Sequence, residues 1–144
     1  MNFIQQLKAG DQTACTPYHF VESVKQNRSP MFDCYKNVDD MVNHFNKVFE
    51  SFDRWEYLAV DDRGVVQAVL VFLIDEYDLH KGCPVILPLM AYSNVKGALA
   101  SGYKEMKQIA RERGIGWLMT QRGEGDQIIS KYHKITSCKD HDTM

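Results

Sequence analysis

The stretch from Cys83 to Gln121 constrains the fold most, because two apolar runs enclose an amphipathic segment. The first run, residues 85–92, is too short for a solitary core helix and predicts a buried strand. Ser93 and Asn94 follow as good helix caps, and apolar residues then recur at helical spacing: Val95, Leu99, Tyr103, Met106 and Ile109. Gly114 ends this helix, and residues 115–120 predict a second buried strand. Such a unit predicts two parallel strands joined by a right-handed crossover.

The remaining segments predict a sheet that is otherwise antiparallel. In the first third of the chain, their patterns favour a strand at 2–7, an irregular helix at 17–26 capped by Asp11, and a loop at 26–33. A helix at 38–52, capped by Asn37, follows. Strands 55–60 and 65–74 then form a hairpin around the turn 61–64. Residues 75–82 form a polar connection, Asp126 caps a short helix containing Ile128, Ile129 and Tyr132, and residues 136–144 form a polar tail. We therefore expect one α+β domain over residues 1–144, with a mixed, mostly antiparallel central sheet and one parallel crossover.

Composition excludes several classes of protein. With 44% hydrophobic and 25% charged residues among 144, the chain is predicted to be globular. A net charge of −2 without a Lys/Arg run argues against a dedicated nucleic-acid binder. Residues 1–10 are too polar for a signal peptide, and the apolar stretch 65–74 is too short to span a bilayer. We expect a cytoplasmic protein whose cysteines, at positions 15, 34, 83 and 138, are free thiols.

The start of the crossover helix has the composition of an anion site. Residues 92–104 contain no Asp or Glu, while Lys96 and Lys104 are basic and five residues between them are small. A helix N-terminus offers unpaired N–H groups and partial positive charge, which suits a phosphate. The alternative is that small residues merely let the helix pack closely on the sheet.

The element order and this helix start resemble the GNAT superfamily of acyl-CoA-dependent N-acyltransferases. In that family the fourth strand leads into a Q/R-x-x-G-x-G/A loop, whose backbone N–H groups bind the coenzyme A pyrophosphate, and the fourth and fifth strands splay apart around the pantetheine arm. Here Gly97 matches the first glycine, Asn94 stands at the Arg/Gln position, and Leu99 replaces the last small residue. The resemblance implies acetyl-CoA as co-substrate, held by Tyr92, Asn94, Val95, Lys96, Gly97 and Ala98.

A second part of the resemblance lies near the C-terminus. Family members often end their fourth helix with a Tyr before a Gly-Phe pair, and this Tyr protonates the departing thiolate. Tyr132 and Ile135 fit that frame, with Thr136 and Ser137 in place of Gly-Phe. The resemblance implies that Tyr132 is a general acid and that the final hairpin of the family is short or absent. Small tailed-phage proteins are similar to worn GNAT domains in the same loose way, so a phage origin is a further expectation.

The amine substrate must lose a proton before it attacks, so we expect a carboxylate near the sheet centre. Glu76, after the third strand, is the best-placed candidate, followed by Glu56 and Asp75; an ordinary solvated charge is the alternative for each. The segment Arg122–Asp126 is interpreted as a turn plus cap rather than a phosphate loop. The Cys138/His141 spacing lacks the further ligands that a zinc site needs, so no metal is predicted.

Two functions from different classes remain open at the level of sequence. The first is an acyl-CoA-dependent N-acyltransferase that transfers an acetyl group from acetyl-CoA to an amine, as the resemblance implies. The second is a non-catalytic GNAT-fold phage protein that binds another protein or forms part of a virion. A small-ligand sensor on the same fold is a third, less specific possibility. An exposed aromatic strand face would also be compatible with a homodimer.

Overall fold

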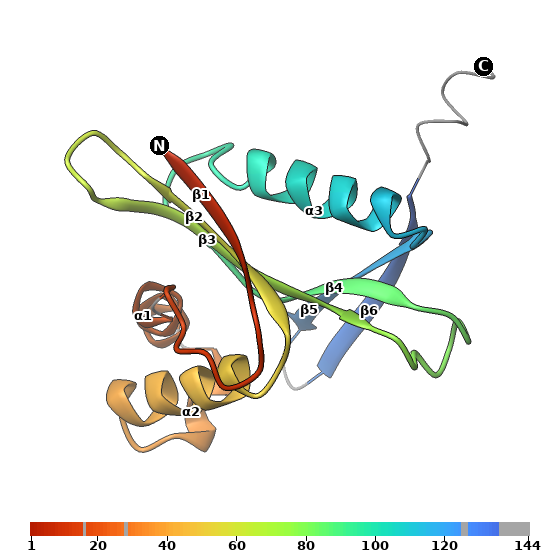
Figure 1. Ribbon diagram of the computed structural model, residues 1–144. Helices are drawn as coiled ribbons and strands as arrows, with labels where there is room; N and C mark the ends of the chain where they lie inside the picture. The colour runs from red at the N-terminus through yellow and green to blue at the C-terminus, as the bar shows by residue number, and fades with distance from the viewer. Residues whose placement is uncertain (16, 28, 125–126, 136–144) are drawn as a thin grey trace.

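A six-stranded sheet with helices on both faces forms the protein (Figure 1). The computed structural model describes residues 1–15, 17–27, 29–124 and 127–135. The elements are β1 (Asn2–Leu7), α1 (Tyr18–Gln26), the 3-10 helix η1 (Pro30–Cys34), α2 (Val38–Glu50), β2 (Arg54–Val60), β3 (Val66–Asp75), β4 (Val85–Ser93), α3 (Ala100–Glu112), β5 (Trp117–Glu124) and β6 (Gln127–Lys134). The strands lie in the sheet in sequence order, β1 to β6.

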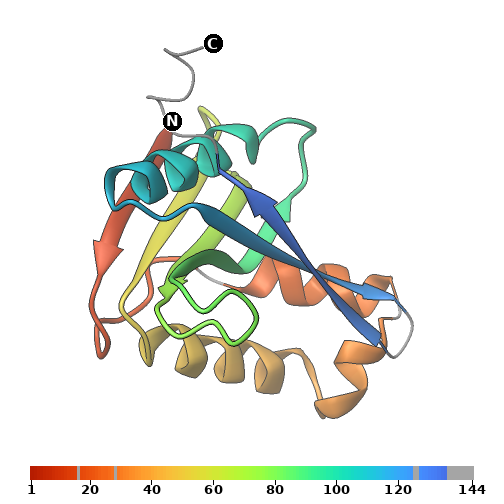
Figure 2. The same ribbon diagram turned by 90° about the vertical axis from the view of Figure 1, so that its right-hand side faces the viewer.

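The pairing of the strands confirms the predicted mixed α+β sheet. Every neighbouring pair is antiparallel except β4 and β5, which are parallel and are joined through α3. Helices α1 and α2 lie on one face of the sheet and α3 lies on the other (Figures 1 and 2). Among the described residues, none of the helices has the length and apolar character needed to cross a lipid bilayer.

The central strand β3 is apolar on both faces because helices cover both. Alternate residues of a strand point to opposite faces. Leu70 and Phe72 pack with Met106 and other residues on the α3 side, whereas Val69 and Val71 pack with residues of the α1–α2 side such as Phe49. This arrangement confirms the prediction that the second strand of the hairpin lies in mid-sheet.

The last element corrects the sequence prediction. Residues 127–134 form β6, not a short helix, and β6 pairs with β5 along its whole length, from Trp117↔Lys134 to Glu124↔Gln127. The spacing of Ile128, Ile129 and Tyr132 matches one turn of helix as well as it matches a strand, and only the pairing with β5 decides between them. The expectation of a short or absent final hairpin concerns the residues after the Tyr132–Ile135 frame, 136–144, which lie outside the described residues. Asp126, predicted as the cap, lies outside the described residues.

The start of α3 lies further along the chain than predicted. The helix begins at Ala100, and residues 94–99 form turns in which Ala98 N–H donates to the Val95 carbonyl and Ala100 N–H donates to the Gly97 carbonyl. Gly97 has a φ of +84°, which other residues adopt only with strain. Asn94 does not cap the helix, because its side-chain amide donates to the Val66 carbonyl of β3 at 3.1 Å. Apolar periodicity missed this boundary because Val95 and Leu99 continue the pattern of the helix into the turns.

Helix α3 packs closely on β2 where Gly102 faces Tyr57. A β-carbon added to Gly102 would lie 2.7 Å from Cδ1 and 2.9 Å from Cε1 of the Tyr57 ring. Tyr57 is only 2% exposed, so its ring has no free space to move into. Part of the small-residue stretch is therefore explained by helix–sheet packing, the alternative that the sequence left open.

We expect Gly102→Ala to destabilise the protein. Alanine favours a helix by about 1 kcal/mol over glycine, but overpacking a core typically costs about 1–3 kcal/mol. Urea denaturation of the variant should therefore show a lower free energy of unfolding than the wild type. Gly116→Ala is the matched control, because a β-carbon there meets no atom within 4 Å. A stabilised Gly102→Ala variant would show that α3 does not lie this close to Tyr57.

Candidate active site

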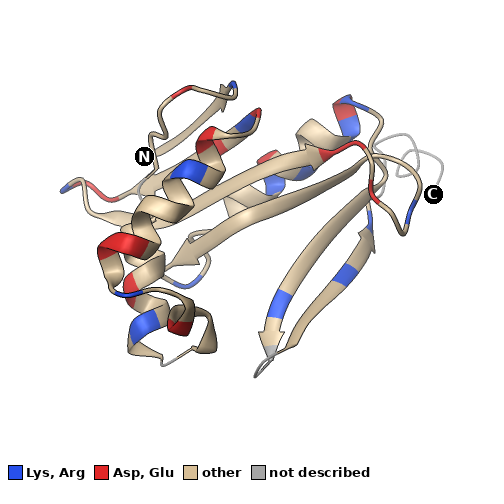
Figure 3. Ribbon diagram, turned by 90° about the horizontal axis from the view of Figure 1, so that it is seen from below, with Lys and Arg blue, Asp and Glu red and all other residues tan. Residues whose placement is uncertain are grey.

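Strands β4 and β5 pair at one position and then separate. The only residues that pair between them in the described structure are Ile86 and Leu118, near the start of each strand, whereas β3 and β4 pair from Asp75↔Val85 to Ala68↔Ser93. Figures 2 and 3 show β5 and β6 leaving the rest of the sheet at an angle. Beyond Ile86 the edge of β4 that faces β5 has backbone groups that no neighbouring strand pairs, so they are available to a ligand.

A bulge interrupts β4 in its middle. Val71 of β3 lies opposite Met90, but the next residue, Phe72, lies opposite Pro88, so Leu89 has no partner of its own on β3. A bulge of this kind bends a strand and redirects its backbone groups, and bulges are common beside active sites. Leu89 is half-buried and lies on the stretch of β4 that β5 has left.

The loop between β4 and α3 presents exposed backbone donors. Residues 93–97 are all exposed. Asn94 N–H donates to the Gln67 carbonyl at 3.0 Å, and Ala98 N–H is also used within the loop. The N–H groups of Val95, Lys96 and Gly97 have no partner among the described residues. The predicted cradle is therefore open at three consecutive amides, with the Lys96 side chain beside them.

Tyr92 lies apart from these amides. Its ring stacks on His19 of α1, with 5.8 Å between ring centroids and an interplanar angle of 21°. Both side chains are half-buried. Tyr92 is thus held where the end of β4 meets α1.

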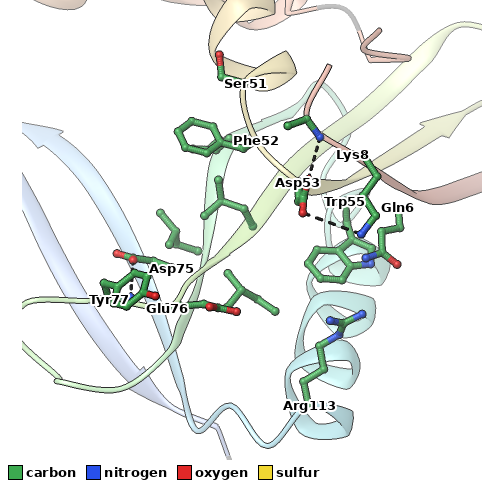
Figure 4. A pocket seen from close by; sticks show the side chains of 15 residues that line it. Gln6, Lys8, Ser51, Phe52, Asp53, Trp55, Asp75, Glu76, Tyr77 and Arg113 are labelled. Atoms are coloured by element: carbon green, nitrogen blue, oxygen red, sulfur yellow. Dashed lines mark hydrogen bonds and ion pairs between the residues drawn. The ribbon is translucent and has the colours of Figure 1, made fainter. Parts of the chain in front are cut away.

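A groove of about 820 Å³ lies at the other end of β4 (Figure 4). Its volume falls in the range of small-molecule sites. Leu87 and Leu89 contribute the β4 part of its wall, so the groove reaches the bulge. The remaining lining combines acidic, basic, aromatic and small polar side chains with a few apolar ones: Gln6, Lys8, Ala9, Ser51, Phe52, Asp53, Trp55, Leu73, Ile74, Asp75, Glu76, Tyr77 and Arg113.

Glu76 and Asp75, two of the predicted carboxylates, both line this groove. Glu76 is exposed in the turn after β3, and Asp75 accepts a hydrogen bond from Tyr77 N–H at 3.0 Å. Since Asp75 pairs with Val85 and Ala68 pairs with Ser93, Glu76 and the loop containing Gly97 lie at opposite ends of β4. The nine residues of β4 separate the two ends by about 26 Å. The structure does not bring the predicted base and the predicted coenzyme loop together.

Tyr132 lies on β6, in contact with the connection between β3 and β4. Its hydroxyl donates to both carboxylate oxygens of Asp78, at 3.0 and 3.2 Å, and Lys81 Nζ lies 3.7 Å from the centroid of the Trp117 ring and 5.1 Å from that of Tyr132. Burial, together with the hydrogen bond and charge of Asp78, raises the pKa of Tyr132. Burial alone would raise the pKa of Asp78, but hydrogen bonds from the Lys81 amide and the Tyr132 hydroxyl outweigh it and lower that pKa. These contacts fasten the β3–β4 connection to the β5–β6 hairpin.

Glu56, the remaining carboxylate candidate, is buried and fully bonded. It is 2% exposed and accepts hydrogen bonds from Arg54 Nε at 2.8 Å, Thr13 Oγ1 at 2.7 Å, Ala14 N–H at 2.8 Å and Cys15 N–H at 3.1 Å. A carboxylate with this environment has no capacity left to accept a proton from a substrate, so the structure contradicts a role as base. Burial, followed by the charge of Glu56, raises the pKa of Cys15 to about 12, which makes this thiol a poor nucleophile.

We expect Glu56→Gln to destabilise the fold by about 3–5 kcal/mol, the usual cost of removing one partner of a buried ion pair. The change leaves the Arg54 guanidinium, which is 0% exposed, without its counter-charge. Denaturant titration would measure this loss. Glu105→Gln, on the exposed side of α3, is the matched control and should change stability by less than about 0.5 kcal/mol. Equal effects of the two substitutions would show that the Arg54–Glu56 pair does not hold the β1–α1 segment.

Comparison with known proteins supports the architecture. No family model and no curated protein sequence matches the chain. Among solved structures, a mutant of the BH1408 protein from Bacillus halodurans matches with a TM-score of 0.57 at 10% identity, over 85% of this chain and 83% of that one. AAC(6')-Iy, solved with the bisubstrate analogue CoA-S-monomethyl-acetylneamine, matches with a TM-score of 0.52 at 13% identity, over 88% of this chain and 82% of that one.

The chain has a GNAT-like fold. The predicted fold class is thereby confirmed. At these identities the likeness concerns the fold alone, and the activity of a GNAT-like protein has to be argued from its own residues.

Proposed function

We propose that this GNAT-like protein is an acyl-CoA-dependent N-acyltransferase that transfers an acetyl group from acetyl-CoA to an amine. The observation that carries the proposal is the separation of β4 from β5 after the Ile86–Leu118 pair. Their separation leaves an unpaired strand edge that leads from an exposed loop of free amides to a groove. The solved structure of AAC(6')-Iy, which has a similar fold, holds an analogue that contains coenzyme A and gives further support.

The loop between β4 and α3 would bind the pyrophosphate of coenzyme A. The N–H groups of Val95, Lys96 and Gly97 are the donors, and the Lys96 ammonium supplies positive charge. Gly97 lets a phosphate approach the backbone, because a β-carbon there would point into open space that the ligand needs. Asn94 contributes indirectly, because its two hydrogen bonds to β3 fix the start of the loop. Ala98, next to Gly97, completes the contact surface, whereas Tyr92 is stacked on His19 and supports the end of β4 before the loop.

The groove would take the amine. Asp53, Asp75 and Glu76 give its lining carboxylates that attract an ammonium group, and the exposed Tyr77 adds an aromatic face that favours cations. The Trp55 ring is already covered by Phe72 and by the Arg113 guanidinium. The ammonium group loses a proton to Glu76 through water in the groove, and the neutral nitrogen attacks the thioester carbonyl to form a tetrahedral intermediate, whose nitrogen then gives up its second proton to water. Collapse of the intermediate breaks the carbon–sulfur bond, forms the amide and releases the coenzyme thiolate, which takes a proton. Tyr132 as the source of that proton stays a prediction, because its hydroxyl already donates to Asp78.

Acetyl-CoA should raise the thermal stability of the protein by mass action. At a concentration of acetyl-CoA one hundred times the dissociation constant, the gain in unfolding free energy is about 2.7 kcal/mol. Gly97→Asp should abolish the shift, because it adds bulk and negative charge to the phosphate site. Gly82→Asp is the matched control: Gly82 also has a positive φ, of 64°, and open space around it, but it lies in the β3–β4 connection. Binding that survives Gly97→Asp would place the coenzyme elsewhere.

Tyr132→Phe tests the proposed general acid. Removal of a general acid typically lowers turnover about 10²–10⁴-fold, and the KM for acetyl-CoA should stay unchanged. Asp78→Asn is the matched control, because it weakens the contact between the β3–β4 connection and β6 but keeps the phenol. Equal losses of kcat in the two variants would show that Tyr132 acts by positioning this connection and is not the acid.

A non-catalytic binding protein is the second candidate, and one observation favours it. Asn94 stands where the family has Arg or Gln, and its side chain is bonded to β3 instead of facing the loop. A phage-encoded virion or interaction protein on this fold would have no need of a coenzyme site. Under this candidate, millimolar acetyl-CoA leaves the melting temperature unchanged, whereas the enzyme proposal requires an increase.

A further inference from the structure

The outer edge of β1 carries backbone groups that have no partner. β1 is the first strand of the sheet and pairs on one side only, with β2 (Figure 2). Met1 and Val60 exchange both of their hydrogen bonds, at 2.8 and 3.0 Å. In an antiparallel ladder such pairs recur at every second residue, so Phe3, Gln5 and Leu7 bond to β2. Asn2, Ile4 and Gln6 therefore turn their N–H and C=O groups outward, where no described residue bonds to them.

Nothing in the sequence of β1 protects this edge. Natural sheets guard free edges with charged residues, proline or bulges. Residues 2–7 contain no charge and no proline, and their register with β2 is uninterrupted. Phe3 and Ile4 are 52% and 39% exposed. The opposite edge strand, β6, differs, because it carries exposed Lys131 and Lys134.

We propose that a second copy of the chain pairs with this edge, so that the protein is a homodimer with a continuous sheet. The outward groups determine the register. An antiparallel pairing must set Asn2, Ile4 and Gln6 of one copy against the same three residues of the other. Only a two-fold axis through Ile4 gives all three residues a partner. It pairs Asn2 with Gln6 of the second copy, Ile4 with Ile4 of the second copy, and Gln6 with Asn2 of the second copy. Each of these three pairs exchanges two hydrogen bonds.

The side chains agree with this register. Ile4 lies opposite Tyr57, whose ring is on the α3 side of the sheet, so the two Ile4 side chains meet on that face. Phe3 lies opposite Leu58, on the α1–α2 side. There it faces Gln5 of the second copy and lies diagonal to Phe3 of the second copy. Pairing would cover the two large apolar side chains that β1 leaves exposed, and none of the six residues of β1 carries a charged side chain.

The mass in solution, measured by sedimentation or light scattering, tests the proposal. The monomer has a mass of 16.6 kDa. We expect a shift to twice this mass between about 5 and about 500 µM, because one pair of strands makes a small interface. Ile4→Lys places two like charges across the axis and should weaken association at least about tenfold. Ile128→Lys, at a 70% exposed position on β6, makes the same change on the other edge and should leave association unchanged.

Amide hydrogen exchange of the wild type gives a second, independent measurement. The Phe3 amide bonds to β2 and should be protected at every concentration, whereas the Ile4 amide should become protected only where the dimer forms. A monomer at all concentrations would overturn the proposal. A dimer in which the Ile4 amide exchanges freely, or one that Ile128→Lys disrupts and Ile4→Lys does not, would overturn it equally.

Discussion

The contact of Tyr57 with the start of α3 is the interaction on which the rest of the site depends. The Tyr57 ring lies against Gly102, and its hydroxyl donates to the Ala98 carbonyl at 3.3 Å. One buried side chain therefore sets both the depth of the helix on the sheet and the position of the loop before it. Because Asn94 anchors the other end of that loop to β3, the amides between them face outward without a partner. The packing of the helix and the exposure of these amides are thus two consequences of the same contact with Tyr57.

A second group of contacts explains how β4 and β5 can separate while the β5–β6 hairpin stays attached to the rest of the sheet. Asp78 and Lys81 hold Tyr132 and Trp117 beside the single Ile86–Leu118 pair. The connection before β4 is thereby fastened to β5 and β6 at the end where the two parallel strands meet. Beyond the Ile86–Leu118 pair, no backbone ladder joins β4 and β5 in the described structure. The side-chain contacts and this one backbone pair therefore hold the strands together at the end where the opening begins.

The sequence predicted the elements whose patterns are local and missed those that depend on distant partners. The crossover was predictable because an apolar run, a helical repeat and a second apolar run follow one another within 40 residues. β6 was missed because Ile128, Ile129 and Tyr132 fit a helical turn, and only β5 makes them a strand. Arg54 and Glu56, two residues apart on one strand face, were a signal for a buried ion pair. Their burial could not be predicted, because it comes from the β1–α1 segment folding over them.

The positions of the predicted site residues restrict how a reaction could use them. From Ser93, the end of β4 next to the Gly97 loop, a ligand would reach the bulge at Leu89 by following the free edge of β4 for four residues, about 13 Å. From the bulge to Glu76, at the far end of β3, is a similar distance of about 13 Å. A carboxylate that far from the bulge cannot take a proton there by direct contact. Proton transfer to Glu76 would therefore need water in the groove, whose polar lining at Asp53, Asp75 and Glu76 can hold it.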